Sequence, residues 1–342
     1  MMTSRERVRR CVEFDKPDRV PRDLWMLPIA ALEHDAAALE LFKQRWPTDF
    51  GWAPVPNPGL EAMRKGDWYA IGTFRDEWGC EFENLQAGVI GEVKHPPLAD
   101  WSRLEDLRPP EAALKIDREA INRFCPRSDK FVSGDALPRP FERMQFLRGS
   151  ENLYMDIAEE SDEFLELRQI VHDFFCKELE VWCRTKVDGV KFMDDWGAQR
   201  GLLISPEKWV KLFKPLYADY VKIAHDAGKK IFMHSDGHIQ DIYPHLVDLK
   251  VDAVNSQLFC MPIEELSRRF KGKITFWGEI DRQHLLSYAT PAEVREGVRR
   301  VVENLYSPEG GVIAQFEFGA ATKLANADAA FSAWEEFTQP LR

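Results

Sequence analysis

Side chains that can do chemistry follow five short apolar stretches in the second half of the sequence. The stretches lead in turn into Asp194-Asp195, His234-Ser235-Asp236, Asn255-Ser256-Gln257, Glu279 and Glu317. Carboxylate and imidazole groups can transfer protons or hold a divalent metal ion, and amides can orient a polar substrate. Five such endings in succession predict one built site, and therefore an enzyme.

The stretches themselves have the character of buried parallel strands. Strands of this kind are covered on both faces, so they read as continuous apolar runs. Segments of helical periodicity separate them at intervals of about 30–40 residues, which is the pattern of repeated βαβ units. We therefore predict an α/β fold of the (β/α)8 TIM-like barrel type, with its site at the C-terminal ends of the strands. A doubly wound open sheet is the alternative, but no Gly-x-Gly-x-x-Gly follows the first strand.

The first half of the sequence is less regular. Residues 3–14 have the pattern of a short amphipathic helix, and residues 22–26 and 130–135 have the pattern of two further strands. Between them, the region of about 30–110 is rich in tryptophan and proline and contains a hairpin pattern at 71–93. We interpret this region as an irregular N-terminal excursion that shapes the mouth of the barrel, within a single domain that covers residues 1–342.

Composition excludes several classes of protein. The chain has 44% hydrophobic and 30% charged residues, which is typical of a globular protein, and a net charge of −11. Binding to nucleic acid or to a membrane surface needs a basic face, so neither is expected. The six cysteines show no close pairing, and the first ten residues lack the apolar core of a signal peptide. We expect a cytoplasmic enzyme that acts on a small molecule. A homodimer is one assembly that the sequence permits.

Short motifs link the sequence to a known family. In the second half they are Asp194-Asp195-Trp196-Gly197-Ala198-Gln199, His234-Ser235-Asp236-Gly237, Asn255-Ser256-Gln257, Gly278-Glu279-Ile280-Asp281 and Gly310-Gly311-Val312-Ile313-Ala314, and in the first half Arg5-Glu6-Arg7 and Pro17-Asp18-Arg19-Val20-Pro21. In order and spacing they resemble the uroporphyrinogen decarboxylase superfamily, and most closely its corrinoid-dependent methyltransferase-like members. The resemblance covers most of the chain outside about 30–110, and it implies a distorted (β/α)8 barrel with its active cleft at the C-terminal mouth.

The resemblance to the decarboxylases themselves is weaker. These enzymes begin with an arginine-rich segment that binds the carboxylates of the substrate, whereas this chain has Arg22-Asp23-Leu24-Trp25 at that place. They also carry Gly-His-Gly near the last strand, where this chain has residues 315–319, Gln-Phe-Glu-Phe-Gly. A polycarboxylate would meet like charges in such an acidic cleft, because unit charges repel by about a kcal/mol or more at close range. Decarboxylation of uroporphyrinogen in porphyrin biosynthesis is therefore the alternative, not the preferred reading.

The methyltransferase members carry a zinc site written His-x-Cys, with a second cysteine after the last strand. His234 matches the histidine of this motif, but Asp236 takes the place of the first cysteine, and Phe316 or Glu317 the place of the second. The resemblance implies a divalent metal, with zinc as the expected ion, held by His234, Asp236 and Glu317. A site of nitrogen and oxygen ligands is harder than a thiolate site and favours oxygen substrates such as a methyl ether, a phenol or an alcohol.

The sequence thus predicts a corrinoid-linked methyltransferase, which moves a methyl group between a small methylated compound and a corrinoid carried on a partner protein. The expected catalytic residues are Asp194, Asp195, His234 and Glu279, with one of the two adjacent aspartates facing the cleft. The expected substrate-binding residues are Trp25, Trp196, Gln199, Asn255 and Gln257. A non-catalytic ligand-binding member of the family is the further alternative.

Overall fold

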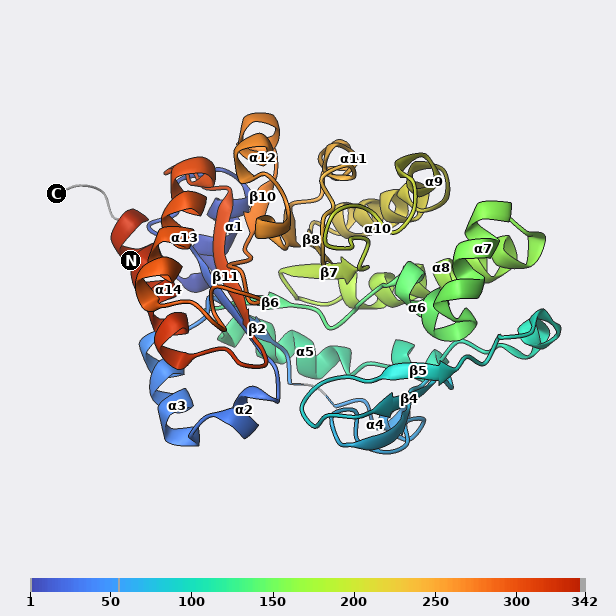
Figure 1. The fold of residues 1–342 in the computed structure, drawn as a ribbon. Coiled ribbons are helices and arrows are strands. Elements are labelled where there is room, and N and C mark those ends of the chain that lie inside the picture. Colours follow the sequence, from blue (N-terminus) through green and yellow to red (C-terminus); the bar gives the residue numbers. More distant parts are fainter. Residues whose placement is uncertain (1, 55, 339–342) are drawn as a thin grey trace.

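Eight parallel strands form the centre of the molecule in the computed structural model, which describes residues 2–54 and 56–338 (Figure 1). Their order in the sheet is β1-β11-β10-β9-β8-β7-β6-β2. The strands are β1 (Arg22–Met26), β2 (Phe50–Trp52), β6 (Phe131–Ser133), β7 (Gly189–Met193), β8 (Lys230–Ser235), β9 (Ala253–Ser256), β10 (Thr275–Trp277) and β11 (Val312–Phe318). The sheet curls into a nearly closed barrel, so the predicted (β/α)8 TIM-like fold is confirmed.

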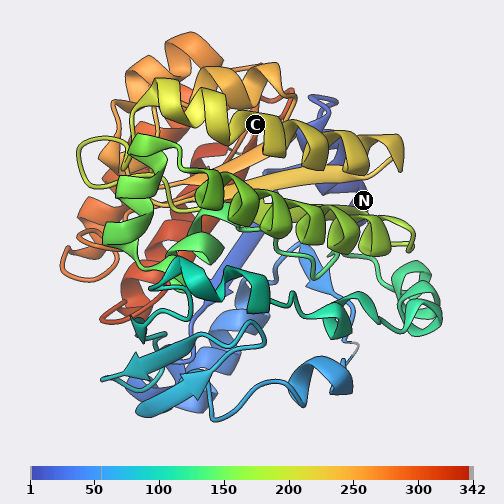
Figure 2. The same ribbon diagram turned by 90° about the vertical axis from the view of Figure 1, so that its right-hand side faces the viewer.

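Helices surround this barrel. They are α1 (Ser4–Val12), α2 (Ala30–Glu33), α3 (Ala36–Arg45), α4 (Pro58–Glu61), α5 (Arg118–Phe124), α6 (Pro140–Arg148), α7 (Ser150–Glu159), α8 (Asp162–Cys183), α9 (Pro206–Leu212), α10 (Lys214–Asp226), α11 (Tyr243–Asp248), α12 (Ile263–Phe270), α13 (Pro291–Leu305) and α14 (Leu324–Thr338). Figure 2 shows the long helices α8 and α10 side by side across the strands. None of the described helices combines the length and the apolar character that crossing a membrane requires.

The barrel interior is filled with aromatic side chains, as expected for a packed core that is not a pore. Phe50 stacks on Trp277 with ring centroids 5.8 Å apart, and Phe232 meets Trp277 edge to face at 5.2 Å. The N-terminal helix α1 adds Val8 and Cys11 to the same buried cluster. The interior and α1 therefore leave the opposite end, where the strands finish, as the place for a site.

A buried carboxylate ties the N-terminus to the seam between the two end strands of the sheet. Asp49, which directly precedes β2, is fully buried and accepts hydrogen bonds from Arg7, Arg19 and the backbone N–H of Arg22. Its own N–H donates to the carbonyl of Arg22 at 2.8 Å. Arg22 begins β1, so this one side chain joins β1 to the start of β2 and anchors α1 beneath them.

The region of about 30–110 differs in one respect from the expected excursion, because β2 lies within it and completes the barrel sheet. The remainder agrees with the expectation. The predicted hairpin is part of a three-stranded antiparallel sheet of β3 (Gly72–Arg75), β4 (Glu81–Asn84) and β5 (Glu92–His95), which lies beside the barrel at the lower right of Figure 1. Arg143 of α6 holds it there through a buried ion pair with Asp76. That the whole chain is a single domain stays a prediction.

Candidate functional site

The polar ends of five neighbouring strands meet at the C-terminal mouth of the barrel. Asp195 follows β7, Asp236 follows β8 and Glu279 follows β10, while His234 and Glu317 are the penultimate residues of β8 and β11. Parallel strands in register bring such positions together, and His234 indeed pairs with Met193 on one side and Asn255 on the other. The expectation that these segments form one cluster agrees with the geometry, although the roles of the individual residues stay predictions.

Two glycines let the loops after β7 and β8 touch. A Cβ atom on Gly197 would lie 2.4 Å from the backbone nitrogen of His238, and one on Gly237 would lie 2.1 Å from the carbonyl oxygen of Gly197. Gly237 also has φ +76, a backbone conformation that favours glycine. This close approach brings the carboxyls of Asp195 and Asp236 to the same side of the mouth, and Asp236 N–H donates to Asp195 Oδ1 at 2.9 Å.

A buried amide sets the orientation of the histidine. His234 Nδ1 lies 2.6 Å from Asn255 Oδ1. The Asn255 amide nitrogen donates to the carbonyl oxygen of Trp277 at 2.5 Å and to Gln315 Oε1 at 2.8 Å, so its oxygen must face the imidazole. His234 Nδ1 therefore carries a proton and donates it to Asn255, which leaves the lone pair of Nε2 directed to the mouth.

Three potential ligand atoms converge at that lone pair. His234 Nε2 lies 3.5 Å from Asp195 Oδ1 and 3.7 Å from Asp236 Oδ1, and the ligand atoms of the three residues all lie within 4.8 Å of one another. Asp236 Oδ1 is buried and has no hydrogen-bond partner among the described residues. Three acceptors so close together repel unless a cation or a proton lies between them. The donor set, one imidazole with a second-sphere amide and two carboxylates, fits a divalent metal ion.

Arg282 neutralises the other acids of the mouth. Its guanidinium contacts Asp236 and lies 3.3 Å from Glu279 Oε2 and 3.4 Å from Glu317 Oε1. Burial raises the pKa of Glu279 well above its usual range, against the opposing effect of Arg282, and burial also raises the pKa of Glu317. Glu317 therefore pairs with an arginine, and Asp195 takes its place beside His234. Of the expected metal set of His234, Asp236 and Glu317, the first two lie in one cluster with Asp195, and that they hold a metal stays a prediction.

Asp194 is structural and not part of the open mouth. It is 0% exposed, and its carboxylate accepts from the backbone N–H groups of Phe141 and Glu142 at 3.1 and 2.8 Å and from the hydroxyl of Tyr217 at 2.6 Å. These contacts fix the start of α6 against β7. Burial and then the charge of Glu142 raise the pKa of Asp194 well above its usual range. Of the two adjacent aspartates, Asp195 faces the cleft, and the expected catalytic role of Asp194 is not supported.

The two tryptophans expected at the pocket lie in different surroundings. Trp25 lies beside His234, edge to face with ring centroids 5.0 Å apart, and is partly exposed. Trp196 is 0% exposed, stacks on Phe141 at 4.1 Å and donates from Nε1 to Tyr217 at 2.7 Å. Trp196 therefore belongs to the core and leaves no surface for a substrate. Trp25 remains a candidate for substrate contact.

The three amide side chains expected to bind a substrate also lie in different surroundings. Asn255 is 0% exposed, and its side chain is hydrogen-bonded to His234 and Gln315. It therefore orients His234 and is not available to bind a substrate. Gln199 and Gln257 line a cavity of about 180 Å³ together with Glu279 and Arg282. Glu279 Oε1 is buried and lacks a partner among the described residues. This cavity beside the metal-type cluster is suited to a small polar group.

Two further residues of the mouth were not singled out in the sequence. Lys191, on β7, places its ammonium 4.3 Å from the ring centroid of Trp52 and 5.7 Å from that of Trp25, and burial lowers its pKa to about 8. In the sequence, a lysine within an otherwise apolar strand could have marked Lys191 as a residue of the site. Burial, and then the charge of Asp195, raise the pKa of Glu142 on α6 to about 7. Nothing local in the sequence marks Glu142, because only the packing of α6 brings it to the site.

Comparison with known proteins gives two kinds of likeness. Residues 70–337 match the model of a protein family described as uroporphyrinogen decarboxylase (URO-D). Among solved structures, the chain is similar to a methyltransferase from Methanosarcina mazei, with 15% identity, 98% of this chain and 99% of that chain covered, and a TM-score of 0.66. At this identity the likeness shows the fold alone.

A second solved structure is a protein from Listeria monocytogenes named "putative vitamin-B12 independent methionine synthase". The two sequences are 12% identical, and the match covers 94% of this chain and 97% of that chain. The TM-score is 0.45, which is too low to support a conclusion about this chain. No curated protein matches the sequence.

The position of Glu142 makes stability depend on pH. Its pKa is about 7 in the folded protein, against an ordinary value of 4.5. The folded state therefore binds the proton more tightly, and this contribution to stability is complete below about pH 4.5 and lost as the pH rises through about 7. We expect Glu142→Gln to raise the melting temperature by roughly 2–4 °C at about pH 8 but not at about pH 4.5. Equal shifts at both values, measured by calorimetry, would contradict this.

Proposed function

Because the chain belongs to the uroporphyrinogen decarboxylase family, we propose that it is a corrinoid-linked methyltransferase of the methyltransferase-like branch. The observation that carries the proposal is the cluster of Asp195, His234 and Asp236. His234 and Asp236 occupy the first two positions of the motif with which the methyltransferase-like members hold zinc. The proposed substrate is a small methylated compound, and the proposed methyl carrier is a corrinoid on a partner protein.

The cluster supports a metal-dependent function through its own chemistry. Asp195, His234 and Asp236 would hold a divalent ion, with zinc as the expected one, and Asn255 would keep His234 in the tautomer that exposes Nε2. A bound zinc ion acts as a Lewis acid on an oxygen ligand. Arg282 forms ion pairs with Asp236 and Glu279. Its positive charge offsets part of the negative charge at the rim, and this reduces the repulsion between the carboxylates near His234.

The type of ligand favours an oxygen substrate. Imidazole and carboxylate ligands make a harder site than the cysteine ligands of the family motif. A methyl ether, a phenol or an alcohol therefore suits the site better than a thiol. The cavity beside the cluster, with the amides of Gln199 and Gln257 and the buried Glu279, offers hydrogen-bonding groups for the oxygen end of such a compound.

Arg22 and Arg282 count against the decarboxylase alternative. Arg22, the only arginine of the segment where the decarboxylases place several, forms an ion pair with Glu335 and lies over the ring of Trp46. Arg282 at the mouth already contacts three carboxylates. A substrate with several carboxylates would thus meet acids whose arginine partner is engaged, which is unfavourable at short range.

Metal affinity separates the cluster from the other acids of the mouth. We expect the protein, stripped with a chelator and titrated with zinc against a chromogenic competitor, to lose at least about tenfold in affinity on Asp195→Asn or His234→Ala. Glu317→Gln removes a carboxylate from the same rim and serves as the matched control, and it should change affinity by less than about threefold, because Glu317 pairs with Arg282. Equal losses in Asp195→Asn and Glu317→Gln would contradict the assignment.

Methyl transfer itself is tested with free corrinoid in place of the partner protein. Zinc-loaded protein is incubated anaerobically with cob(I)alamin and, in separate reactions, methanol and methyl phenyl ether, and the visible spectrum is followed for methylcobalamin. We expect enzyme-dependent methylation that His234→Ala lowers by about two orders of magnitude or more. A parallel assay with uroporphyrinogen should yield no coproporphyrinogen. Decarboxylation of uroporphyrinogen without any methylation of the corrinoid would overturn the proposal.

A further inference from the structure

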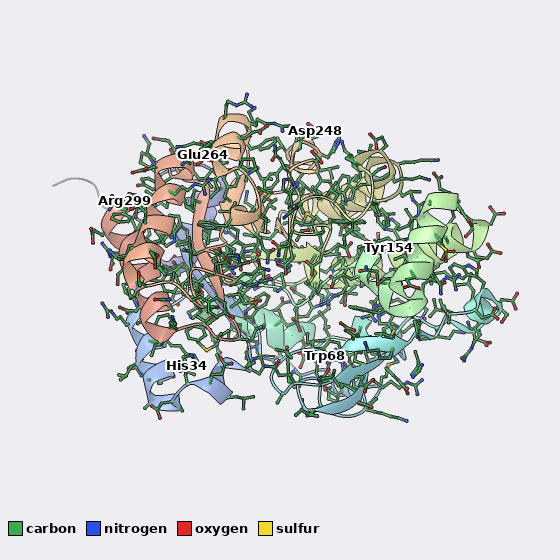
Figure 3. The ribbon with its side chains drawn as sticks, in the orientation of Figure 1. His34, Trp68, Tyr154, Asp248, Glu264 and Arg299 are labelled. Carbon is green, nitrogen blue, oxygen red and sulfur yellow. The ribbon has the colours of Figure 1, made fainter. Side chains whose placement is uncertain are left out.

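A cavity of about 720 Å³ lies between the three-stranded sheet and the barrel helices, apart from the cluster at His234. Its walls combine aromatic side chains, among them Trp68, Phe74, Trp78 and Phe175, with charged side chains of both signs. Trp68 is labelled in Figure 3, where it lies among the strands beside the barrel, and its ring meets that of Phe74 at 4.4 Å. A space of this size falls in the range of about 300–1,000 Å³ that is usual for small-molecule sites.

One arginine of this cavity is uncommitted. Arg64 binds Glu77 at 2.8 Å and Arg143 is held by Asp76, so the charges of both are balanced by carboxylates. Arg139 lines the same cavity and is half-buried, yet its guanidinium has no hydrogen-bond or ion-pair partner within residues 2–54 and 56–338. A guanidinium offers five donors in a planar fork that matches a carboxylate.

An acid of raised pKa lies in the same wall. Burial raises the pKa of Glu178, on α8, to about 8. Its carboxyl accepts only a long hydrogen bond, 3.4 Å, from the backbone N–H of Leu137. In its protonated form this side chain can donate a hydrogen bond. Asp135 is a further acid of the lining.

Arg139 also connects this cavity to the mouth of the barrel. It directly precedes α6, whose first backbone N–H groups donate to Asp194. On the other side, the carbonyl of Pro138 accepts from the N–H of Met193 at 2.8 Å. The backbone next to Arg139 is thus hydrogen-bonded to Met193 at the end of β7, two residues before Asp195.

We propose that this cavity binds a small planar organic anion, with its carboxylate on Arg139 and its ring against the aromatic wall. Trp68, which is partly exposed, supplies flat apolar surface for the ring, and Arg139 supplies donors for the carboxylate. The binding site stands on the cavity alone.

The binding site is tested by titration of the full chain with three probes, followed by calorimetry and by tryptophan fluorescence, because two tryptophans line the cavity. Benzoate carries both the ring and the charge, benzamide carries the ring without the charge, and acetate carries the charge without the ring. We expect benzoate to bind at least about tenfold more tightly than either of the others. Equal affinity of benzoate and benzamide, or no saturable binding of benzoate, would overturn the proposal.

Two arginine variants locate the charge that binds the carboxylate. Arg139→Gln should weaken benzoate by about tenfold or more and leave benzamide within about twofold. Arg123→Gln is the control, because Arg123 is an exposed arginine of α5 that pairs with Glu119 and is remote from the lining. It should leave both probes unchanged. Equal weakening of benzoate by the two variants, or none by Arg139→Gln in a variant that melts as the parent does, would refute the role of Arg139.

The pH dependence of benzoate binding tests the contribution of Glu178. The groups that face Glu178 are the Leu137 N–H, Asp135, Glu77, Arg139 and the hydroxyl of Tyr220, and Arg64 and Arg143 line the same cavity. As Glu178 loses its proton above about pH 8, its charge repels the carboxylate, so affinity should fall about threefold or more between about pH 7 and pH 9. Glu178→Gln should remove this fall. An unchanged fall in Glu178→Gln would contradict the inference for this residue.

The outcomes also separate this inference from the proposed function. Benzoate binding needs neither metal nor corrinoid, and His234→Ala should leave it within about twofold. Selective benzoate binding without methyl transfer would uphold the binding site and sink the methyltransferase proposal. Methyl transfer from methyl phenyl ether without selective benzoate binding would uphold the methyltransferase proposal and overturn the anion-binding site. Loss of benzoate binding in His234→Ala would place the anion at the metal-type cluster and overturn the separate site.

Discussion

The hydrogen bond between His234 and Asn255 is the constraint on which the site depends. A neutral imidazole can present either nitrogen, and the choice is made here by an amide whose own donors are held by Trp277 and Gln315. Because that amide can only accept from Nδ1, Nε2 is left to face Asp195 and Asp236. If the amide were free to turn, the histidine could exchange tautomers and the three acceptors would no longer be a preformed ligand set.

The barrel provides this constraint and also limits what else can lie at the mouth. Aromatic side chains fill its interior below the site, so polar groups can gather only at the strand ends. Four of the strands bring the excess negative charge of Asp195, Asp236, Glu279 and Glu317 to this mouth. Arg282 resolves this excess by drawing Glu279 and Glu317 to one side. Arg282 also contacts Asp236, so Asp195 is the acid beside His234 that forms no ion pair with this arginine, and the amide-lined cavity lies next to both.

The sequence alone could predict the barrel and the positions of its polar residues, because buried parallel strands leave an apolar pattern that ends abruptly. It could also predict that only one of Asp194 and Asp195 faces the cleft, since neighbouring residues of a strand point to opposite faces. It could not predict which one, because the choice depends on the distant helix α6, whose N–H groups bind Asp194. The core position of Trp196 and the pairing of Glu317 with Arg282 have the same origin. Each is decided by a partner far away in the chain, and no local spacing records it.

The central claim is that a preformed set of nitrogen and oxygen ligands at the barrel mouth holds a metal ion. X-ray absorption at the zinc edge of the zinc-loaded protein tests it most directly. The account predicts a first shell of nitrogen and oxygen atoms at about 2.0–2.2 Å, with the outer scattering of an imidazole and no sulfur. Cys260, the cysteine of the amide-lined cavity, would reveal itself as a zinc–sulfur distance of about 2.3 Å. A sulfur shell, or zinc surrounded by water without imidazole scattering, would contradict the account.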